Sequence, residues 1–130
     1  LSGCVICEQL DGALNRYAYT IAQLYGTNAE FKQMLDASKG FCLPHLALVL
    51  DMAQKTLPAA QADAFSKAVA AVELPNLKRL SDELEWFTLK YDFRNADKPW
   101  GNSRDAVERS INKLMGACVG DEAKMPAHND

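Results

Sequence analysis

Apolar residues recur every three or four positions along most of the chain, and this spacing predicts amphipathic helices. The pattern is clearest between residues 10 and 24, where five apolar residues are spaced 4, 3, 4 and 3 apart. We expect Gly26 to end this first helix as its C′ residue, and Asn28 to cap a short second helix. The buried stripe of the first helix is expected to be Leu10, Leu14, Tyr17, Ile21 and Leu24, and the second helix carries Phe31, Met34 and Leu35.

A third helix is expected after the break at Gly40. Pro44 suits its first turn, because the N–H that proline lacks would have no partner there. The helix should stop near Leu57. Its buried face is expected to hold Leu46, Val49 or Leu50, and Ala53.

From Pro58 the helical spacing continues to Tyr91, with a proline in the middle. Pro75 would remove one backbone hydrogen bond and crowd the preceding turn. Because the apolar stripe resumes almost in phase, we predict one long helix kinked near Pro75, with two separate helices as the alternative. The expected buried residues are Phe65, Ala68, Val69 and Val72 before the proline, and Leu77, Leu80, Leu84, Phe87 and Tyr91 after it.

The last helix follows the loop NADKPWG. We expect Asn102 or Ser103 to cap it, and Val107, Ile111, Leu114 and Met115 to form its inner face. No stretch alternates like a strand, so the predicted fold is an all-α bundle of about five or six helices. Residues 1–116 are expected to form a single helical domain, and the polar residues 117–130 a flexible tail.

Composition excludes several classes of protein. The 130 residues are 48% hydrophobic and 24% charged, with a formal net charge of −3. Lysine and arginine are scattered, which argues against nucleic-acid binding. No apolar run reaches the length of a membrane span and no signal peptide opens the chain, so we expect a cytoplasmic protein. The first residue is Leu1, and we expect a trimmed or excised domain.

Two short motifs suggest a metal site. Cys4 and Cys7 form a Cys-x-x-Cys pair, and Cys42 and His45 form a Cys-x-x-His pair. Each pair adjoins a predicted helix start, where the helix dipole favours a thiolate. Three thiolates and one imidazole are a recognised set of structural zinc ligands, so we predict a zinc site that clamps two helix N-termini together.

Other interpretations of these cysteines stay open. They include an iron–sulfur cluster, a disulfide or dithiol redox pair, and no special role. The redox interpretation lacks the βαβ context of thioredoxin-like motifs. We expect Cys118 to be a spare thiol and His128 to be a solvated tail residue.

Charged and aromatic residues crowd the stretch ELEWFTLKYDFRNADKPWGNSRDA. One interpretation is a polar binding pocket. The other, which we favour, is a helix C-terminus and turn held by salt bridges, with Trp100 packed as a plug. The candidate pocket residues are Trp86, Lys90, Asp92, Arg94 and Trp100.

The segments CVIC, RYAYTIAQLY, FKQMLDASKGFCLPHL and LEWFTLKYDFRNADKPWGNSRDA together resemble an uncharacterised bacterial family, a domain of unknown function. The resemblance covers about Cys4 to Met115 and is to the C-terminal half of that family. It implies a pattern, Cys-x-x-Cys then Gly-x-Cys-x-x-His, that occurs once in each half. Here one copy is present, and it falls on Cys4, Cys7, Cys42 and His45.

The resemblance implies no activity. We expect a zinc-binding helical module that works by protein–protein interaction or as a scaffold, with a protein partner or self-association. Four protein ligands would leave zinc no open position for catalysis. The alternatives are a thiol redox protein, or a redox or metal sensor, that uses Cys4 and Cys7.

Overall fold

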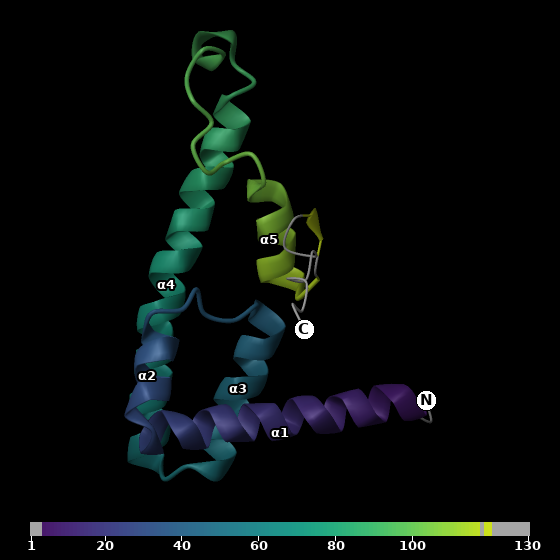
Figure 1. Cartoon of the computed structure of the whole chain (residues 1–130), viewed down its shortest axis with the longest axis vertical. Coiled ribbons are helices and arrows are strands. Elements are labelled where there is room, and N and C mark those ends of the chain that lie inside the picture. The colour runs from purple at the N-terminus through teal and green to yellow at the C-terminus, as the bar shows by residue number, and fades with distance from the viewer. Residues whose placement is uncertain (1–3, 118, 121–130) are drawn as a thin grey trace, which may run out of the picture. The chain divides into compact units, whose positions relative to one another are not determined.

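The structure is a computed structural model, which describes residues 4–117, 119 and 120. Within this part of the chain every regular element is helical, as the sequence predicts. The elements are α1 (Val5–Thr27), α2 (Ala29–Asp36), α3 (Leu43–Thr56), α4 (Ala59–Leu89), the short 3₁₀ helix η1 (Phe93–Asn95) and α5 (Ala106–Met115) (Figure 1). Most of the predicted tail 117–130 lies outside the described residues, as do Cys118 and His128.

The chain divides into two compact units. The first comprises Leu1–Gly40 and His45–Glu73, and the second comprises Phe41–Pro44 and Leu74–Asp130. The prediction that residues 1–116 form one domain stays a prediction. The two units are described separately below.

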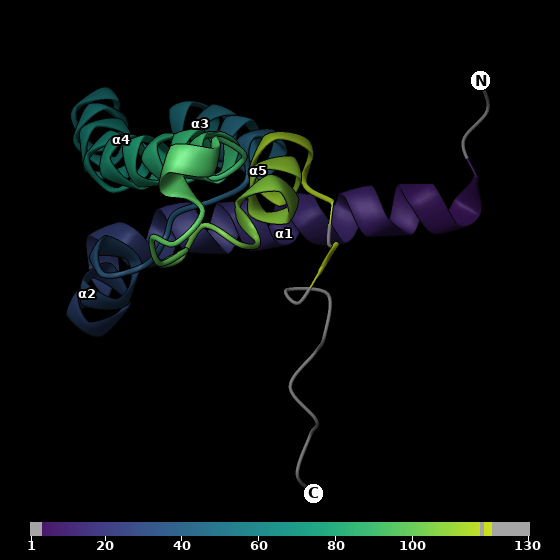
Figure 2. The ribbon, with the colours of Figure 1, turned by 90° about the horizontal axis from the view of Figure 1, so that it is seen from above.

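The first unit has an apolar interior. Its buried side chains come from α1, α3 and the first part of α4, and Phe65 is the largest that is fully buried. The ring of Tyr25 packs edge-on against Phe65, with 5.2 Å between ring centroids. α2 follows α1 directly and packs against it (Figure 2). The buried apolar residues are Ala18, Ala22, Val49, Ala53, Ala62, Phe65, Val69 and Val72.

Two predictions for α1 are wrong. The helix runs through Gly26 to Thr27, so Gly26 is not a C′ residue. The predicted buried stripe is also misplaced, because Leu10 and Tyr17 are 58% and 67% exposed while Ala18 and Ala22 are buried. Ala18 and Ala22 are small enough to be enclosed completely, whereas the larger residues of the predicted stripe stay partly or largely exposed.

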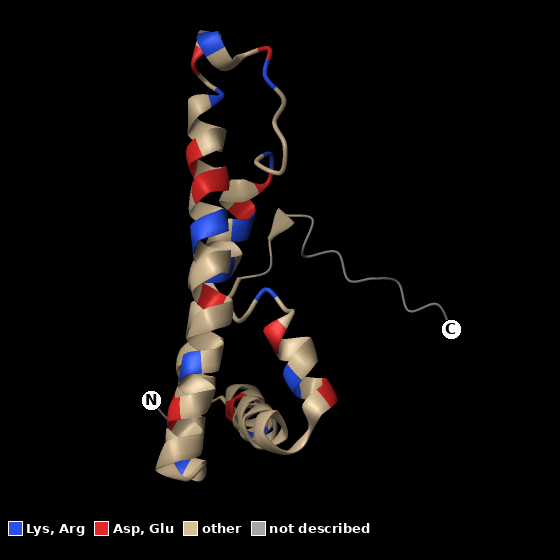
Figure 3. Cartoon of the chain, turned by 90° about the vertical axis from the view of Figure 1, so that its left-hand side faces the viewer, with Lys and Arg blue, Asp and Glu red and all other residues tan. Residues whose placement is uncertain are grey.

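The other helix boundaries largely follow the sequence. Asn28 caps α2, since its side chain accepts a hydrogen bond from the backbone N–H of Phe31 at 2.9 Å. α3 ends at Thr56, close to the predicted stop. Pro75 lies inside a single long α4, so the alternative of two separate helices is wrong. Both signs of charge alternate along this helix (Figure 3). Tyr91, predicted to be buried, lies beyond the end of α4 and is 77% exposed.

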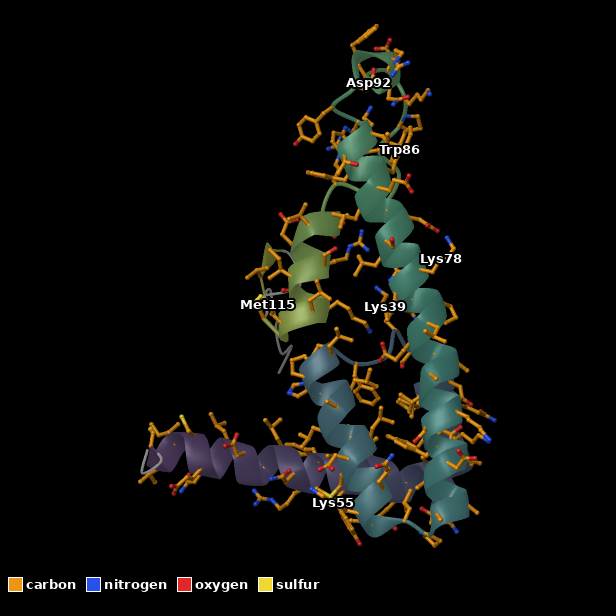
Figure 4. The ribbon with its side chains drawn as sticks, turned by 180° about the vertical axis from the view of Figure 1, so that it is seen from behind. Lys39, Lys55, Lys78, Trp86, Asp92 and Met115 are labelled. Atoms are coloured by element: carbon orange, nitrogen blue, oxygen red, sulfur yellow. The ribbon has the colours of Figure 1, made fainter. Side chains whose placement is uncertain are left out.

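In the second unit α5 runs beside the second part of α4 (Figures 1 and 3). Its predicted N-caps are wrong, because Asp105 precedes the first helical residue, Ala106. Its predicted inner face is wrong as well. The apolar residues point outward, and Met115 lies on the side of α5 that faces away from α4 (Figure 4). The exposed residues are Val107, Ile111, Leu114 and Met115, with exposures of 38%, 39%, 57% and 73%.

Candidate functional site

Cys4 and Cys7 lie at the start of α1, as the sequence predicts. Cys4 is the N-cap residue and Cys7 is the third residue of the helix, and both side chains are exposed free thiols. The Cys4 side chain makes no capping hydrogen bond. Even so, the backbone N–H groups of Cys7 and then Ile6, together with the Cys7 side chain, lower the pKa of the Cys4 thiol below its ordinary value of 9.0. This helix end therefore favours the thiolate, the form that binds metals and attacks disulfides.

Cys42 and His45 lie at the start of α3. Cys42 directly precedes the helix, Pro44 and His45 belong to its first turn, and His45 is exposed. Cys42 is half-buried and is also a free thiol. Gly116 packs against it, since a Cβ atom at this glycine would lie 3.3 Å from Cys42 Sγ. Gly116 ends α5 with a φ of 67°, so the left-handed backbone of the C-cap brings the chain to this thiol.

Gly40 controls the segment that leads to Cys42. Its φ is 76°, and a Cβ atom added here would lie 2.3 Å from Glu73 Oε1. The Glu73 carboxylate is buried and therefore occupies the space that any other residue at 40 would need. The backbone N–H of Gly40 donates to Ser38 Oγ at 3.1 Å, and Ser38 Oγ in turn donates to the carbonyl of Leu35. Position 40 of the Gly-x-Cys-x-x-His motif thus requires glycine for a steric reason, which the sequence alone did not reveal.

The four predicted ligands are divided between the two units. Over residues 4–117, 119 and 120, no three or more His, Cys, Asp and Glu side chains are arranged to hold a metal ion. Cys4, Cys7 and His45 belong to the first unit, and Cys42 belongs to the second. The set of Cys4, Cys7, Cys42 and His45 therefore stays a prediction.

The charged and aromatic segment forms a folded loop at the end of α4, which we call the Lys90 loop and define as residues 90–104. Lys90 is 8% exposed. Its Nζ donates three hydrogen bonds to backbone carbonyls, at 2.8 Å to Asn95, 2.8 Å to Ala96 and 2.6 Å to Lys98. It also lies 5.2 Å from the centre of the Trp100 ring.

The other candidate pocket residues make contacts within or beside the same loop. Trp86 Nε1, in the last turns of α4, donates to the carbonyl of Pro99 at 3.1 Å (Figure 4). Asp92 accepts from the backbone N–H and from the guanidinium of Arg94, and these hydrogen bonds lower the pKa of the Asp92 carboxyl. These are the contacts of a helix end and turn, with Trp100 half-buried. Whether the loop also binds a ligand stays a prediction.

A partly buried polar network joins α5 to α4, and sequence reasoning missed it. The guanidinium of Arg109 donates to Glu83 and to the carbonyl of Asn102, and it lies 3.0 Å from Asp105 Oδ1. Arg79 Nη1 also lies 3.2 Å from Glu83 Oε1. Burial of Arg109 opposes its charge, but hydrogen bonds to Asp105 and Glu83 and their negative charges outweigh that effect and raise the pKa of the guanidinium.

Asn112 continues the polar side of α5. Its side chain is 9% exposed and exchanges two hydrogen bonds with the backbone of Val119, at 2.8 and 3.1 Å. Ala106, Arg109 and Asn112 recur every three residues, and this spacing is the sequence signal that could have identified the inner face. α5 is thus an amphipathic helix whose polar side faces inward.

These features define an all-helical protein with cysteines at two helix starts and a polar-packed second unit. Residues 1–121 match the family described as a family of unknown function (DUF6062), and the chain belongs to that family. No curated protein and no solved structure matches the chain. In the part of the chain that the structure describes, no helix combines the length and the apolar character needed to cross a membrane.

Proposed function

We propose that this protein is a zinc-binding helical module that works by binding another protein. Cys4, Cys7, Cys42 and His45 would hold the ion. The observation that carries the proposal is the N-cap position of Cys4, where backbone N–H groups lower the pKa of the thiol. Zinc binds thiolates rather than thiols, so this position increases the share of the thiol that is in the ligand form.

The ligand chemistry supports a structural role for the ion. Three sulfurs and one imidazole nitrogen complete a tetrahedron, and such a closed site leaves no position for a substrate. Both motif pairs lie at helix starts, so one ion would fix the start of α1 to the start of α3. A helical core exists besides this site, and we therefore expect metal loss to lower stability more than it lowers helix content.

The outward apolar face of α5 supports the binding of a protein partner. Val107, Ile111 and Leu114 lie at i, i+4 and i+7, the spacing of a helix face that docks against another apolar surface. Exposed apolar groups gathered on one helix face are a feature of interaction sites. A second copy of the chain is the first partner to test, by sedimentation.

The first experiment is elemental analysis of the purified protein, combined with alkylation of its thiols before and after chelation. We expect about one zinc per chain, and three thiols that resist alkylation until the metal is removed. A thermal unfolding series with and without chelator should show a lower midpoint after chelation. Circular dichroism should show that most of the helix signal remains.

The test variant is Cys42→Ser, and its matched control is Cys118→Ser. The first removes a proposed ligand and should abolish stoichiometric zinc, whereas the second should leave zinc content unchanged. Full zinc content in Cys42→Ser would contradict the proposed ligand set. A thermal midpoint that chelation leaves unchanged would contradict the structural role.

The second candidate function is thiol redox chemistry, which the lowered pKa of Cys4 beside the Cys7 thiol also favours. The Cys4 thiolate would attack a substrate disulfide, release one substrate sulfur and form a mixed disulfide with the other. Cys7 would then attack Cys4 Sγ and give its proton to the departing substrate sulfur, so that the substrate leaves as a dithiol and Cys4 and Cys7 are joined by a disulfide. Absence of zinc, together with two thiols already oxidised in the purified protein, would favour this candidate.

A further inference from the structure

The ammonium of Lys90 occupies an unusual position for a lysine. It is buried, and an ammonium has three N–H donors. Each donor finds a backbone carbonyl, from Asn95, Ala96 and Lys98. The Trp100 ring adds a cation–π contact at 5.2 Å. Neutral carbonyl oxygens and an aromatic face therefore provide the solvation that water gives to an exposed ammonium.

The backbone that carries these carbonyls also makes hydrogen bonds that do not involve Lys90. The N–H of Asn95 donates to the carbonyl of Asp92 at 2.9 Å, and the N–H of Lys98 donates to the carbonyl of Asn95 at 3.1 Å. The Asn95 side chain donates to the carbonyl of Leu89 at 3.0 Å, which ties the turn to the end of α4. These hydrogen bonds help to shape the turn, and the carbonyl oxygens of Asn95, Ala96 and Lys98 all point to the Lys90 ammonium.

Converging backbone carbonyls are the ligands by which proteins replace the hydration shell of potassium. An ammonium ion carries the same single charge and can be held by the same oxygens. Divalent cations favour carboxylate ligands. The hydrogen-bond acceptors described for Lys90 are all backbone carbonyls. The chemistry of these acceptors is thus that of a monovalent cation site.

We propose that residues 95–98 form a binding site for a monovalent cation of ammonium or potassium type, and that Lys90 fills this site with its own ammonium. Lys90 acts here as a tethered ion that keeps the loop folded. This inference lies outside the proposed zinc function and does not depend on it.

The test is chemical rescue of Lys90→Ala. This variant lacks three methylenes and the ammonium, which are the atoms of propylammonium. We expect the thermal midpoint to fall by about 10 °C, because three buried carbonyls lose a charged donor. Propylammonium, and ammonium to a smaller extent, should restore at least half of the loss. Tetramethylammonium at equal ionic strength has no N–H donor and should restore none of it.

Tryptophan fluorescence makes the test specific to this loop. The chain has two tryptophans: Trp100 lies in the Lys90 loop beside the Lys90 ammonium, and Trp86 donates a hydrogen bond to the loop. The emission of Lys90→Ala should return toward that of the wild type as propylammonium is added, with saturation. The matched control is Lys98→Ala, whose exposed ammonium contacts the Asn95 side chain and the Trp86 ring rather than the converging carbonyls. That variant should respond equally to all the salts.

The outcomes separate cleanly. Equal responses of Lys90→Ala to propylammonium and tetramethylammonium would overturn the proposal. If the variant fails to fold, the wild-type protein provides the test through nitrogen-detected NMR of its lysine ammonium groups. The Lys90 ammonium protons should exchange with water at least tenfold more slowly than those of exposed Lys55 and Lys78. Exchange as fast as at those two lysines would also overturn the proposal.

Discussion

The two compact units of this protein are filled in different ways. Phe65, Val69 and small residues of α1 and α3 fill the first, where burial of apolar surface dominates and Glu73 is the one polar residue described as buried. The second buries only Leu80 and Ala106 among its described apolar residues, and beside them it buries Lys90, Ser103 and Asn112. The larger apolar residues of α5 are exposed instead.

The difference shows two ways of holding helices together. Apolar burial has no direction, so the first unit should tolerate changes of shape that preserve volume. A buried polar group requires a partner with the right geometry, and loss of one partner leaves the other unsatisfied. The second unit should therefore be sensitive to single polar substitutions and less sensitive to the loss of its apolar groups.

The largest effect that tests this comparison is expected from Phe65→Ala. The ring is completely buried and packs on Tyr25, so its removal leaves a cavity. The free energy of unfolding, measured by urea denaturation, should fall by about 3–5 kcal/mol. Phe93→Ala is the control in the second unit. Its ring is 86% exposed, and its removal should change stability by less than about 0.5 kcal/mol.

The second prediction concerns the polar network of the second unit. Arg109→Met should lower the free energy of unfolding by about 3 kcal/mol, because it leaves Glu83 and the Asn102 carbonyl without this donor. The double variant Glu83→Met/Arg109→Met should regain part of that loss in the same urea assay. If Ile111→Ala on the outward face costs as much as Arg109→Met, the contrast between the units is wrong.

Gly40→Ala should have the third-largest effect, about 2 kcal/mol of lost stability. The positive φ strains any other residue, and the new Cβ would meet the Glu73 carboxylate. Gly26→Ala is the matched control within the same unit. Gly26 lies in α1 and nothing lies within 4 Å of its Cβ position, so alanine there should stabilise by about 0.5–1 kcal/mol. Equal effects of the two variants would show that residue 40 has no special conformation.

The smallest effect is expected at high pH and in the first unit. Burial, together with the charge of Asp36 and a hydrogen bond to it, raises the pKa of Tyr25 above its ordinary value of 10.0. The folded state thus favours the neutral phenol. Its contribution is fully present below pH 10 and is lost as pH rises through the folded-state pKa.

Tyr25 is half-buried, so this contribution should stay below about 1 kcal/mol. Asp36→Asn removes the charge and should lower the pKa of Tyr25, which a phenolate absorbance titration measures. An unchanged titration midpoint in Asp36→Asn would show that burial alone raises the pKa.

The sequence predicted the helices better than it predicted their orientation. Asn28, Pro44 and the long α4 were recognisable because capping groups and prolines act within a few residues. The inner faces of α1 and α5 were misassigned because periodicity counts apolar residues without showing which face meets a neighbour. Glu83, which turns the polar side of α5 inward, lies 26 residues from Arg109.

The candidate site was predictable to a similar extent. The positions of Cys4, Cys42 and His45 at helix starts followed from the local pattern. The contacts of Cys42 with Gly116 and of Gly40 with Glu73 join residues distant in sequence, so no spacing rule could find them. Likewise, Lys90 was singled out among the charges of its segment, but its carbonyl partners depend on a backbone turn rather than on residue type.

The enclosure of Lys90 also determines where the chain can be cut. A protease that cleaves after basic residues must draw the side chain into its own specificity pocket. Lys90 would have to leave three carbonyls to enter it, whereas Arg94 on the same loop has a side chain that is 74% exposed. Limited digestion should therefore open this loop after Arg94, and the bond after Lys90 should be hydrolysed only once the loop has unfolded.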